Sequence, residues 1–177
     1  MLTSYLSRRV AAGIAAAGVA VLPLLPAVAQ DAIKVGAPLP LTGPLSPEGL
    51  KQQRGYDLWV ETANTKGGIK AGGKTYTVEI VYTDYASNTP RAVQSAERMI
   101  TDDKVNFLFA PFGSGATKAA SAVSEKYGIP MIAPTASSAE VYDQSYKFLF
   151  GTLTPNDTVS DHEHVVVASG GALQGLA

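Results

Sequence analysis

The sequence predicts an α/β fold in which a parallel sheet carries helices on both faces. Short apolar runs bounded by proline or glycine alternate with longer segments whose apolar residues recur every three or four positions, as in a helix. Loops rich in glycine, proline, serine and threonine follow several of the apolar runs. Parallel strands need right-handed crossovers, so the fold would gather these loops at one edge of the sheet.

The first 29 residues differ from the rest of the chain and predict a cleavable secretory signal peptide. Arg8 and Arg9 precede a run at 10–25 that is uncharged and rich in alanine, valine and leucine, and a small-residue cleavage signal ends at Ala29. Two prolines towards the end of this region argue against a membrane anchor. The arginine pair leaves both the general and the twin-arginine export routes open.

Composition and charge narrow the class of protein. The chain has 177 residues, 46% of them apolar, which is enough for one globular domain after the signal is removed. The formal net charge is -1 and the sequence has no run of basic residues, so no nucleic acid partner is expected. The absence of cysteine excludes disulfides and a lipid attachment site, which favours a soluble protein of the bacterial periplasm.

The mature chain is predicted to begin with a strand at 32–38 and a loop rich in proline and glycine. A helix at 47–65 should follow, with Ser46 as its N-cap and Pro47 at its first position. Trp59 lies on the apolar face of this helix and is expected in the core. A strand at 76–84 comes next.

The second half continues the alternation. A helix should run from 88–90 to about residue 102, and a further strand is expected at 148–151, followed by a linker at 152–157 into another helix. Between them, the stretch at 105–140 predicts a strand at 105–110, a helix at 116–127 and a strand at 130–133. The predicted order is βαβαβαβαβ.

The two loops of this central stretch, at 111–115 and 134–138, predict a binding site. Parallel strands place both at the carboxyl edge of the sheet, where α/β proteins bind ligands. Free amide groups at a helix N-terminus attract an anion such as a carboxylate, and small hydroxyls add further donors. The hydroxyls are those of Ser114, Thr117, Thr135, Ser137 and Ser138.

An alternative for each hydroxyl is that it only caps a helix. Ser137 followed by Glu140 has the spacing of a capping box. Capping is common in proteins, so no single hydroxyl decides between the two interpretations. The occurrence of two such loops in succession favours a shared site.

Other candidate motifs do not support catalysis, a metal or a cofactor. Residues 68–75 match the phosphate-binding pattern G-x-x-x-x-G-K-[ST], but here the helix precedes the loop and the strand follows it, the reverse of a nucleotide-binding loop. His162 and His164 would point in different directions on a helix. Ser114 has no evident base, so no enzyme is predicted.

Three stretches resemble the amino-terminal lobe of type 1 periplasmic binding proteins of the leucine/isoleucine/valine-binding type. They are IKVGAPLPLTGPLSPEG, NTKGGIKAGGKTYTVEIVYTDYASNTPRAV and FAPFGSGATKAASAVSEKYGIPMIAPTASSAE. The resemblance implies a Rossmann-like lobe at 30–155, with 156–177 forming the first crossover and an incomplete start of a second lobe. Proteins of this family are much longer, so the resemblance also implies a truncated or frameshifted chain.

The resemblance further implies a function and a set of site residues. The function is that of the periplasmic solute-binding component of an ABC importer, a monomer that binds an amino acid or similar small carboxylate between two lobes and delivers it to an inner-membrane permease. A ligand-sensing domain of a receptor or regulatory system is the alternative. With one lobe, weak or no binding is expected. The ligand-binding residues would be Phe112, Gly113, Ser114, Thr135, Ala136 and Ser137.

Overall fold

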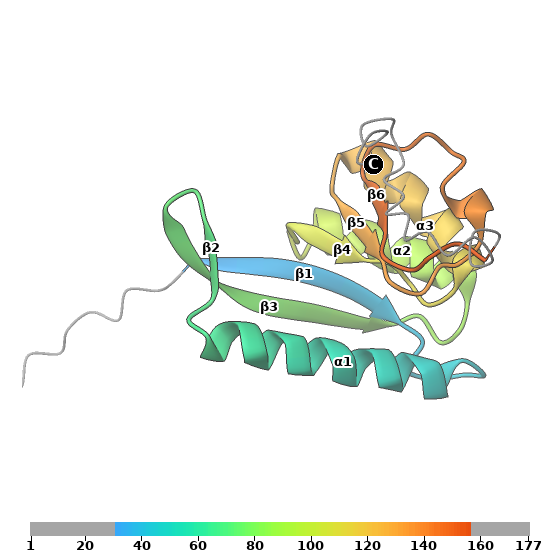
Figure 1. Ribbon diagram of the computed structural model, residues 1–177. Helices are drawn as coiled ribbons and strands as arrows, with labels where there is room; N and C mark the ends of the chain where they lie inside the picture. Colours follow the sequence, from blue (N-terminus) through green and yellow to red (C-terminus); the bar gives the residue numbers. More distant parts are fainter. Residues whose placement is uncertain (1–30, 157–177) are drawn as a thin grey trace, which may run out of the picture.

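The structure is a computed structural model that describes residues 31–156, and these form one mostly parallel sheet with flanking helices (Figure 1). The strand order is β2-β3-β1-β4-β5-β6, in which β2 alone runs antiparallel to its neighbour. In chain order the elements are β1 (Ala32–Leu39), α1 (Ser46–Thr65), β2 (Ile69–Ala71), β3 (Lys74–Asp84), α2 (Thr89–Thr101), β4 (Phe107–Phe109), α3 (Ser114–Tyr127), β5 (Met131–Ala133), the 3-10 helix η1 (Ala139–Val141) and β6 (Leu149–Gly151).

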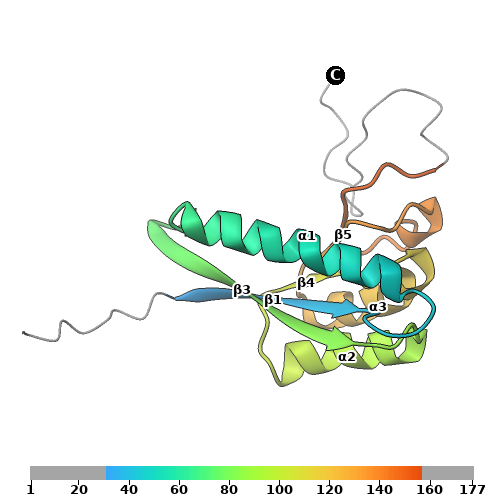
Figure 2. The same ribbon diagram turned by 90° about the horizontal axis from the view of Figure 1, so that it is seen from below.

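The helices cover both faces of the sheet, as predicted. Figure 2 shows α1 on one face and α2 and α3 on the other. Side chains alternate along β1 accordingly: Ala37 and Leu39 pack with Tyr56 of α1. Gly36 faces α2, and a Cβ atom there would lie 2.9 Å from Sδ of Met99 on that helix. The glycine therefore allows α2 to approach the sheet closely.

The main hydrophobic core lies on the α2 and α3 face. It joins the apolar sides of both helices to β4, β5, β6 and the segment around η1. Its buried members are Ala96, Met99, Ile100, Val105, Leu108, Ala110, Ala120, Val123, Met131, Ala133, Ala136, Val141, Tyr142 and Leu149. This core fixes the carboxyl ends of β4 and β5, from which the two predicted site loops emerge.

The predicted helix at 88–102 is confirmed as α2, and the structure shows Asn88 as its N-cap. The side-chain oxygen of Asn88 accepts a hydrogen bond from the amide of Arg91 at 3.0 Å, which satisfies one of the free donors at the helix start. The buried positions of the helix, which include Ala96 and Met99, recur at helical spacing.

The glycine-rich segment before β3 forms a β-hairpin, where the sequence analysis predicts only a turn. Ile69 pairs with Tyr76, and Gly72 and Gly73 make the two-residue turn with φ of 57° and 76°. Positive φ at both positions is the geometry of a type I′ hairpin turn. The rejection of a phosphate-binding loop agrees with this geometry, because the loop leads into a strand and not into a helix.

The segment after β5 does not open an α-helix, so the predicted capping box is wrong. Only the short η1 forms there, and Ser138 precedes it without a side-chain capping bond. Glu140 instead pairs with Lys118 of α3, with 3.6 Å between Nζ and Oε2. Val141 and Tyr142 are buried in the main core, which holds the segment against the body of the lobe and takes the place of a helix.

Two predictions for α1 are also wrong. Ser46 is the first residue of the helix, and Leu45 precedes it as N-cap without a side-chain bond. Trp59 is 38% exposed and meets Phe109 edge-on with 5.7 Å between ring centroids, so it lies at the margin of the core. α1 packs mainly on β1 and β3, and its Tyr56 and Trp59 meet Phe109 of β4 at the margin of this contact.

Several predictions fall outside the described residues. These are the signal peptide at 1–29, the helix expected after the linker at 152–157, and the pair of His162 and His164. Within residues 31–156, no helix is long and apolar enough to cross a membrane.

Candidate functional site

The strand order creates a switch point between β1 and β4. From β1 the chain moves outward to β3 on one side, and it later returns to β4 and moves outward through β5 and β6 on the other. The loops after β1 and β4 therefore leave the carboxyl edge in opposite directions. In open α/β sheets, ligands bind in the crevice that this divergence creates.

Two hydrogen bonds join the loop after β4 to the loop after β5. The amide of Ser138 donates to the hydroxyl oxygen of Ser114 at 3.1 Å. The amide of Gly113 donates to Thr135 Oγ1 at 3.4 Å. The structure thus brings together the two loops that the sequence predicts to converge.

These bonds leave hydrogen-bond donors available at the surface. Both hydroxyl oxygens act as acceptors, so each hydroxyl keeps its proton for another group. The amides of Ser114, Gly115 and Ala116, at the start of α3, donate no hydrogen bond within residues 31–156. Unpaired amides at a helix N-terminus and the helix dipole both favour an anion. The arrangement is suited to binding a carboxylate.

Gly113 and Phe112 shape the approach to these donors. Gly113 has φ 85° and ψ 157°, a conformation that residues with a Cβ rarely adopt. The carbonyl of Phe112, which is half-buried, accepts a hydrogen bond from the hydroxyl of Tyr85 at 3.3 Å. Burial raises the pKa of Tyr85 to about 12, so this hydroxyl stays protonated and continues to donate.

The remaining predicted residues differ in their exposure to solvent. Thr135 and Ser137 are half-buried at the edge of the second loop. Ala136 is fully buried, and its carbonyl accepts a hydrogen bond from the hydroxyl of Tyr142 at 2.9 Å. Thr117 is also fully buried and donates to the carbonyl of Pro111 at 2.9 Å, so its predicted role as an available hydroxyl is wrong.

A clasp between the loops after β1 and β3 was not found by sequence analysis. Asp84 accepts hydrogen bonds from the amides of Leu41 and Thr42 at 2.9 and 3.2 Å, from the Thr42 hydroxyl at 2.6 Å and from the amide of Ala86 at 2.8 Å. Ser87 adds a second connection by donating to the carbonyl of Thr42 at 2.9 Å. The clasp fixes the loop on the β1 side of the switch point.

The charge of Asp84 depends on these contacts. Slight desolvation acts to raise the pKa of Asp84, which is exposed, but the hydrogen bonds from the Thr42 hydroxyl and the three amides outweigh it, and the pKa lies below its ordinary value. The carboxylate is therefore ionised at neutral pH. The signal in the sequence is the group Asp84, Ser87 and Asn88, short polar residues at the end of a predicted strand that favour turns.

The described residues show no catalytic or metal-binding arrangement at this edge. Ser114 hydrogen-bonds through its side chain to the amide of Ser138 and to no base among residues 31–156. That part of the chain also contains no group of histidine, aspartate and glutamate residues that could hold a metal ion.

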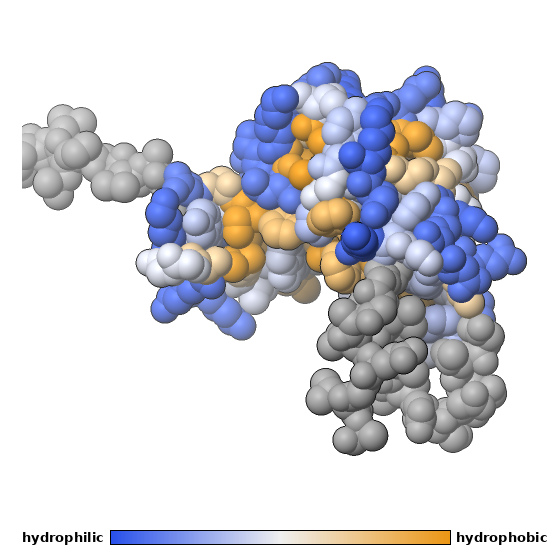
Figure 3. All heavy atoms as spheres, turned by 90° about the horizontal axis from the view of Figure 1, so that it is seen from above, coloured by the Kyte–Doolittle hydropathy of each residue, from blue (hydrophilic) through white to orange (hydrophobic). Residues whose placement is uncertain are grey.

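A separate cavity lies on the sheet face that α1 leaves open. It has a volume of about 570 Å³ and an almost wholly apolar lining, made by Ile33, Val35, Tyr56, Trp59, Ile69, Ala71, Phe107, Phe109 and Ile132. In Figure 3 hydrophobic residues (orange) are exposed on the face seen from above. None of the lining side chains carries a charge, so this cavity is a poor site for a carboxylate.

An α/β sheet with amide and hydroxyl donors at its carboxyl edge is typical of proteins that bind ligands at that edge. Comparison with known sequences then gives the family. A sequence profile described as periplasmic binding protein matches residues 32–170. The chain belongs to the periplasmic binding protein family, and it has the type 1 fold of that family.

Known relatives are binding proteins of the leucine/isoleucine/valine type. The leucine-, isoleucine-, valine-, threonine- and alanine-binding protein of Pseudomonas aeruginosa is 32% identical over 126 residues, which are 71% of this chain and 32% of that protein. The branched-chain amino acid transporter substrate binding protein LivJ from Streptococcus pneumoniae, solved in complex with isoleucine, is 33% identical with a TM-score of 0.64. That match covers 71% of this chain and 34% of LivJ.

A third relative was solved with a different kind of ligand. The solute binding protein of an ABC transporter from R. palustris, in complex with benzoate, is 29% identical with a TM-score of 0.61, and the match covers 72% of this chain and 34% of that protein. The chain spans about a third of the length of these relatives.

Proposed function

We propose that this chain provides one ligand-binding lobe of the periplasmic substrate-binding component of an ABC importer, and that the solute is an amino acid or similar small carboxylate. The observation that carries the proposal is the pair of loops tied by Ser114 and Ser138. This bond and the one from Gly113 to Thr135 use both hydroxyl oxygens as acceptors, so two hydroxyl protons and the free amides of α3 remain available at the carboxyl edge of the sheet.

The ligands of two relatives support the carboxylate as the recognised group. Isoleucine and benzoate differ in their side groups and in the ammonium, but both carry a carboxylate. The donors at the start of α3 and on the two loops suit that shared group. The side group would be selected elsewhere in the cleft.

Each predicted residue has a proposed role. The Ser114 hydroxyl and the main chain at Phe112 and Gly113 bind the carboxylate. Thr135 and Ser137 bind both the carboxylate and the amino group. Ala136, which is fully buried, takes part only through its main chain.

The wider proposal concerns transport. Residues 1–29 direct export to the periplasm, 30–155 form the amino-terminal lobe, and 156–177 lead towards a second lobe that would supply the other wall of the cleft. Closure of the lobes around the solute is what the inner-membrane permease would recognise, with the binding protein acting as a monomer. Residues 31–156 form only one wall, so this chain by itself should bind weakly.

Saturation-transfer NMR tests the proposed ligand class because it detects weak binding. The 177-residue chain should give a transfer signal with L-isoleucine and a much smaller one with L-isoleucinol, in which the carboxylate is replaced by an alcohol. The expected dissociation constant for isoleucine is about 1 mM or weaker. Equal signals for the two compounds would contradict carboxylate recognition, and micromolar binding would contradict the need for a second wall.

A further inference from the structure

The outer edge of β3 has a strand partner only at residues 74–76 of its 11 residues. β1 pairs with β3 along residues 77–84 on one side, whereas β2 pairs only with residues 74–76 on the other. Figure 1 shows β3 as the outer long strand, with α1 running beside it. A free strand edge presents main-chain donors and acceptors to any extended segment that approaches.

The direction of each main-chain group on β3 follows from its partners. The amide of Thr77 donates towards β1, to the carbonyl of Asp31 at 3.2 Å. Val78 faces outward, where the side chain of Asn64 donates to its carbonyl at 2.9 Å and accepts from its amide at 2.8 Å. Asn64 thus occupies the first outward position of the open edge, as a neighbouring strand would.

The next outward positions have no such partner. Main-chain groups alternate between the two sides of a strand, so those of Ile80 and Tyr82 face the same way as those of Val78. Within residues 31–156 they make no main-chain hydrogen bond on that side. Two successive positions are therefore available for strand pairing.

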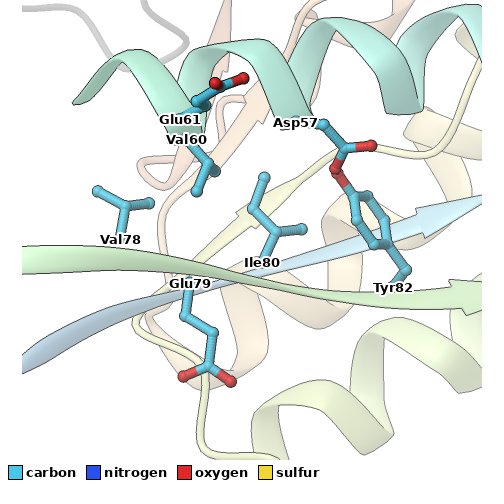
Figure 4. Close-up of a pocket in the computed structure, with 7 residues that line it drawn as sticks. All are labelled: Asp57, Val60, Glu61, Val78, Glu79, Ile80 and Tyr82. Carbon is cyan, nitrogen blue, oxygen red and sulfur yellow. The ribbon is translucent and has the colours of Figure 1, made fainter. Parts of the chain in front are cut away.

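A cavity of about 350 Å³ lies beside this open edge. It is lined by Asp57, Val60, Glu61, Val78, Glu79, Ile80 and Tyr82. Figure 4 shows Val60, Val78 and Ile80 in the space between α1 and β3, whereas Glu79 points to the opposite side of the strand. An added strand would place alternate side chains against this apolar floor.

The charge around the cavity is of one sign. Asp57, Glu61 and Glu79 are acidic, and the lining contains no lysine or arginine. Asp57 accepts a hydrogen bond from the Tyr82 hydroxyl at 2.7 Å, which holds its carboxylate at one end of the cavity. A second copy of this edge would bring like charges together, so charge complementarity favours a basic partner.

We propose that the edge of β3 at Ile80 and Tyr82 is a docking site for an extended segment of a partner protein that alternates apolar residues with lysine or arginine. The segment would add a strand to the sheet through the main chain of these two residues. Its apolar side chains would contact Val60 and Ile80, and its basic side chains would approach Asp57 and Glu61. The site is distinct from the proposed solute site and does not depend on it.

The test uses the 177-residue chain and a fluorescein-labelled seven-residue peptide in which valine alternates with lysine or threonine. Fluorescence anisotropy should show saturable binding. A copy of the peptide with N-methyl groups on its pairing edge cannot donate to β3 and should bind about tenfold or more weakly. Equal binding of the two peptides would overturn strand addition.

Three variants of the chain locate the contact. Ile80→Pro removes the outward amide while the bonds to β1 remain, and it should weaken binding about three- to tenfold. Glu61→Lys leaves the strand untouched and should weaken binding by a similar factor. Asp143→Lys, which makes the same charge change on the exposed segment before β6 at the other end of the sheet, should leave binding unchanged.

Other outcomes would overturn the proposal. They are the absence of peptide binding, equal loss in Glu61→Lys and Asp143→Lys, and self-association of the chain that Ile80→Pro abolishes. The last result would assign the edge to a second copy. Light scattering at several protein concentrations distinguishes it from peptide binding.

Discussion

The amide of Ser138 donates a hydrogen bond to the hydroxyl oxygen of Ser114, and this 3.1 Å contact joins two loops that lie 24 residues apart in the sequence. Because the Ser114 oxygen is the acceptor, its proton remains available to a solute. The same contact therefore holds the rim of the proposed site together and orients one of its donors.

Replacement of Ser114 tests this double role. In Ser114→Ala the amide of Ser138 loses its acceptor and the site loses one donor, so the affinity for isoleucine should fall by about tenfold or more. Thr62→Ala is the control, because it removes an exposed hydroxyl on α1. The saturation-transfer signals of isoleucine with the two variants measure the effect. Equal signals for Ser114→Ala and Thr62→Ala would show that Ser114 does not contribute to the site.

The clasp around Asp84 predicts a loss of stability in acid. The pKa of this carboxyl is lowered in the folded chain, so its contribution to stability is present above the ordinary value of 3.8 and is lost as the pH falls through the folded value. Asp84→Asn should lower the melting temperature at pH 7. Below pH 4, the melting temperature of this variant should fall less steeply than that of the parent chain.

The measurement for the clasp is thermal unfolding by circular dichroism over a series of pH values. Asp143→Asn, which changes an exposed carboxyl in the segment between η1 and β6, provides the comparison. If Asp84→Asn and the parent chain lose stability in parallel below pH 4, the acid sensitivity arises from other carboxyl groups.

Packing at Gly36 predicts a contrast between two glycine substitutions. A Cβ at Gly36 would lie 2.8 Å from Leu108 Cδ2 and 2.9 Å from Met99 Sδ, so Gly36→Ala should destabilise the fold by about 1–3 kcal/mol. A Cβ at Gly55, within α1, meets nothing within 4 Å. Gly55→Ala should therefore stabilise the fold by about 0.5–1 kcal/mol.

Urea unfolding measures both free energies. An unchanged or increased stability in Gly36→Ala would mean that α2 does not pack against β1 as closely as the structure shows. A destabilising Gly55→Ala would contradict the exposed position of that residue on α1.

The sequence was a good guide to elements whose signals are local. The apolar periodicity of α2 predicted that helix, and the apolar runs of β1 and β6 predicted those strands, because each depends on neighbours in the chain. The convergence of the loops at 111–115 and 134–138 could also be predicted, since parallel strands place their loops at one edge.

Features that depend on distant contacts could not be predicted in this way. Whether Ser137 begins a helix is decided by the burial of Val141 and Tyr142 in the main core, which the capping pattern does not reveal. The clasp joins Asp84 to Thr42 across two strands, and the exposure of Trp59 depends on where α1 ends its coverage of the sheet. These are properties of the packed fold.

Chemical-shift mapping tests the central claim most directly. In ¹⁵N-labelled chain titrated with L-isoleucine, the amide signals of Ser114, Gly115 and Ala116 and those of residues 134–138 should shift, with smaller changes elsewhere. Shifts confined to the apolar cavity around Phe107 and Trp59, or no shifts at millimolar isoleucine, would contradict a carboxylate site at the start of α3.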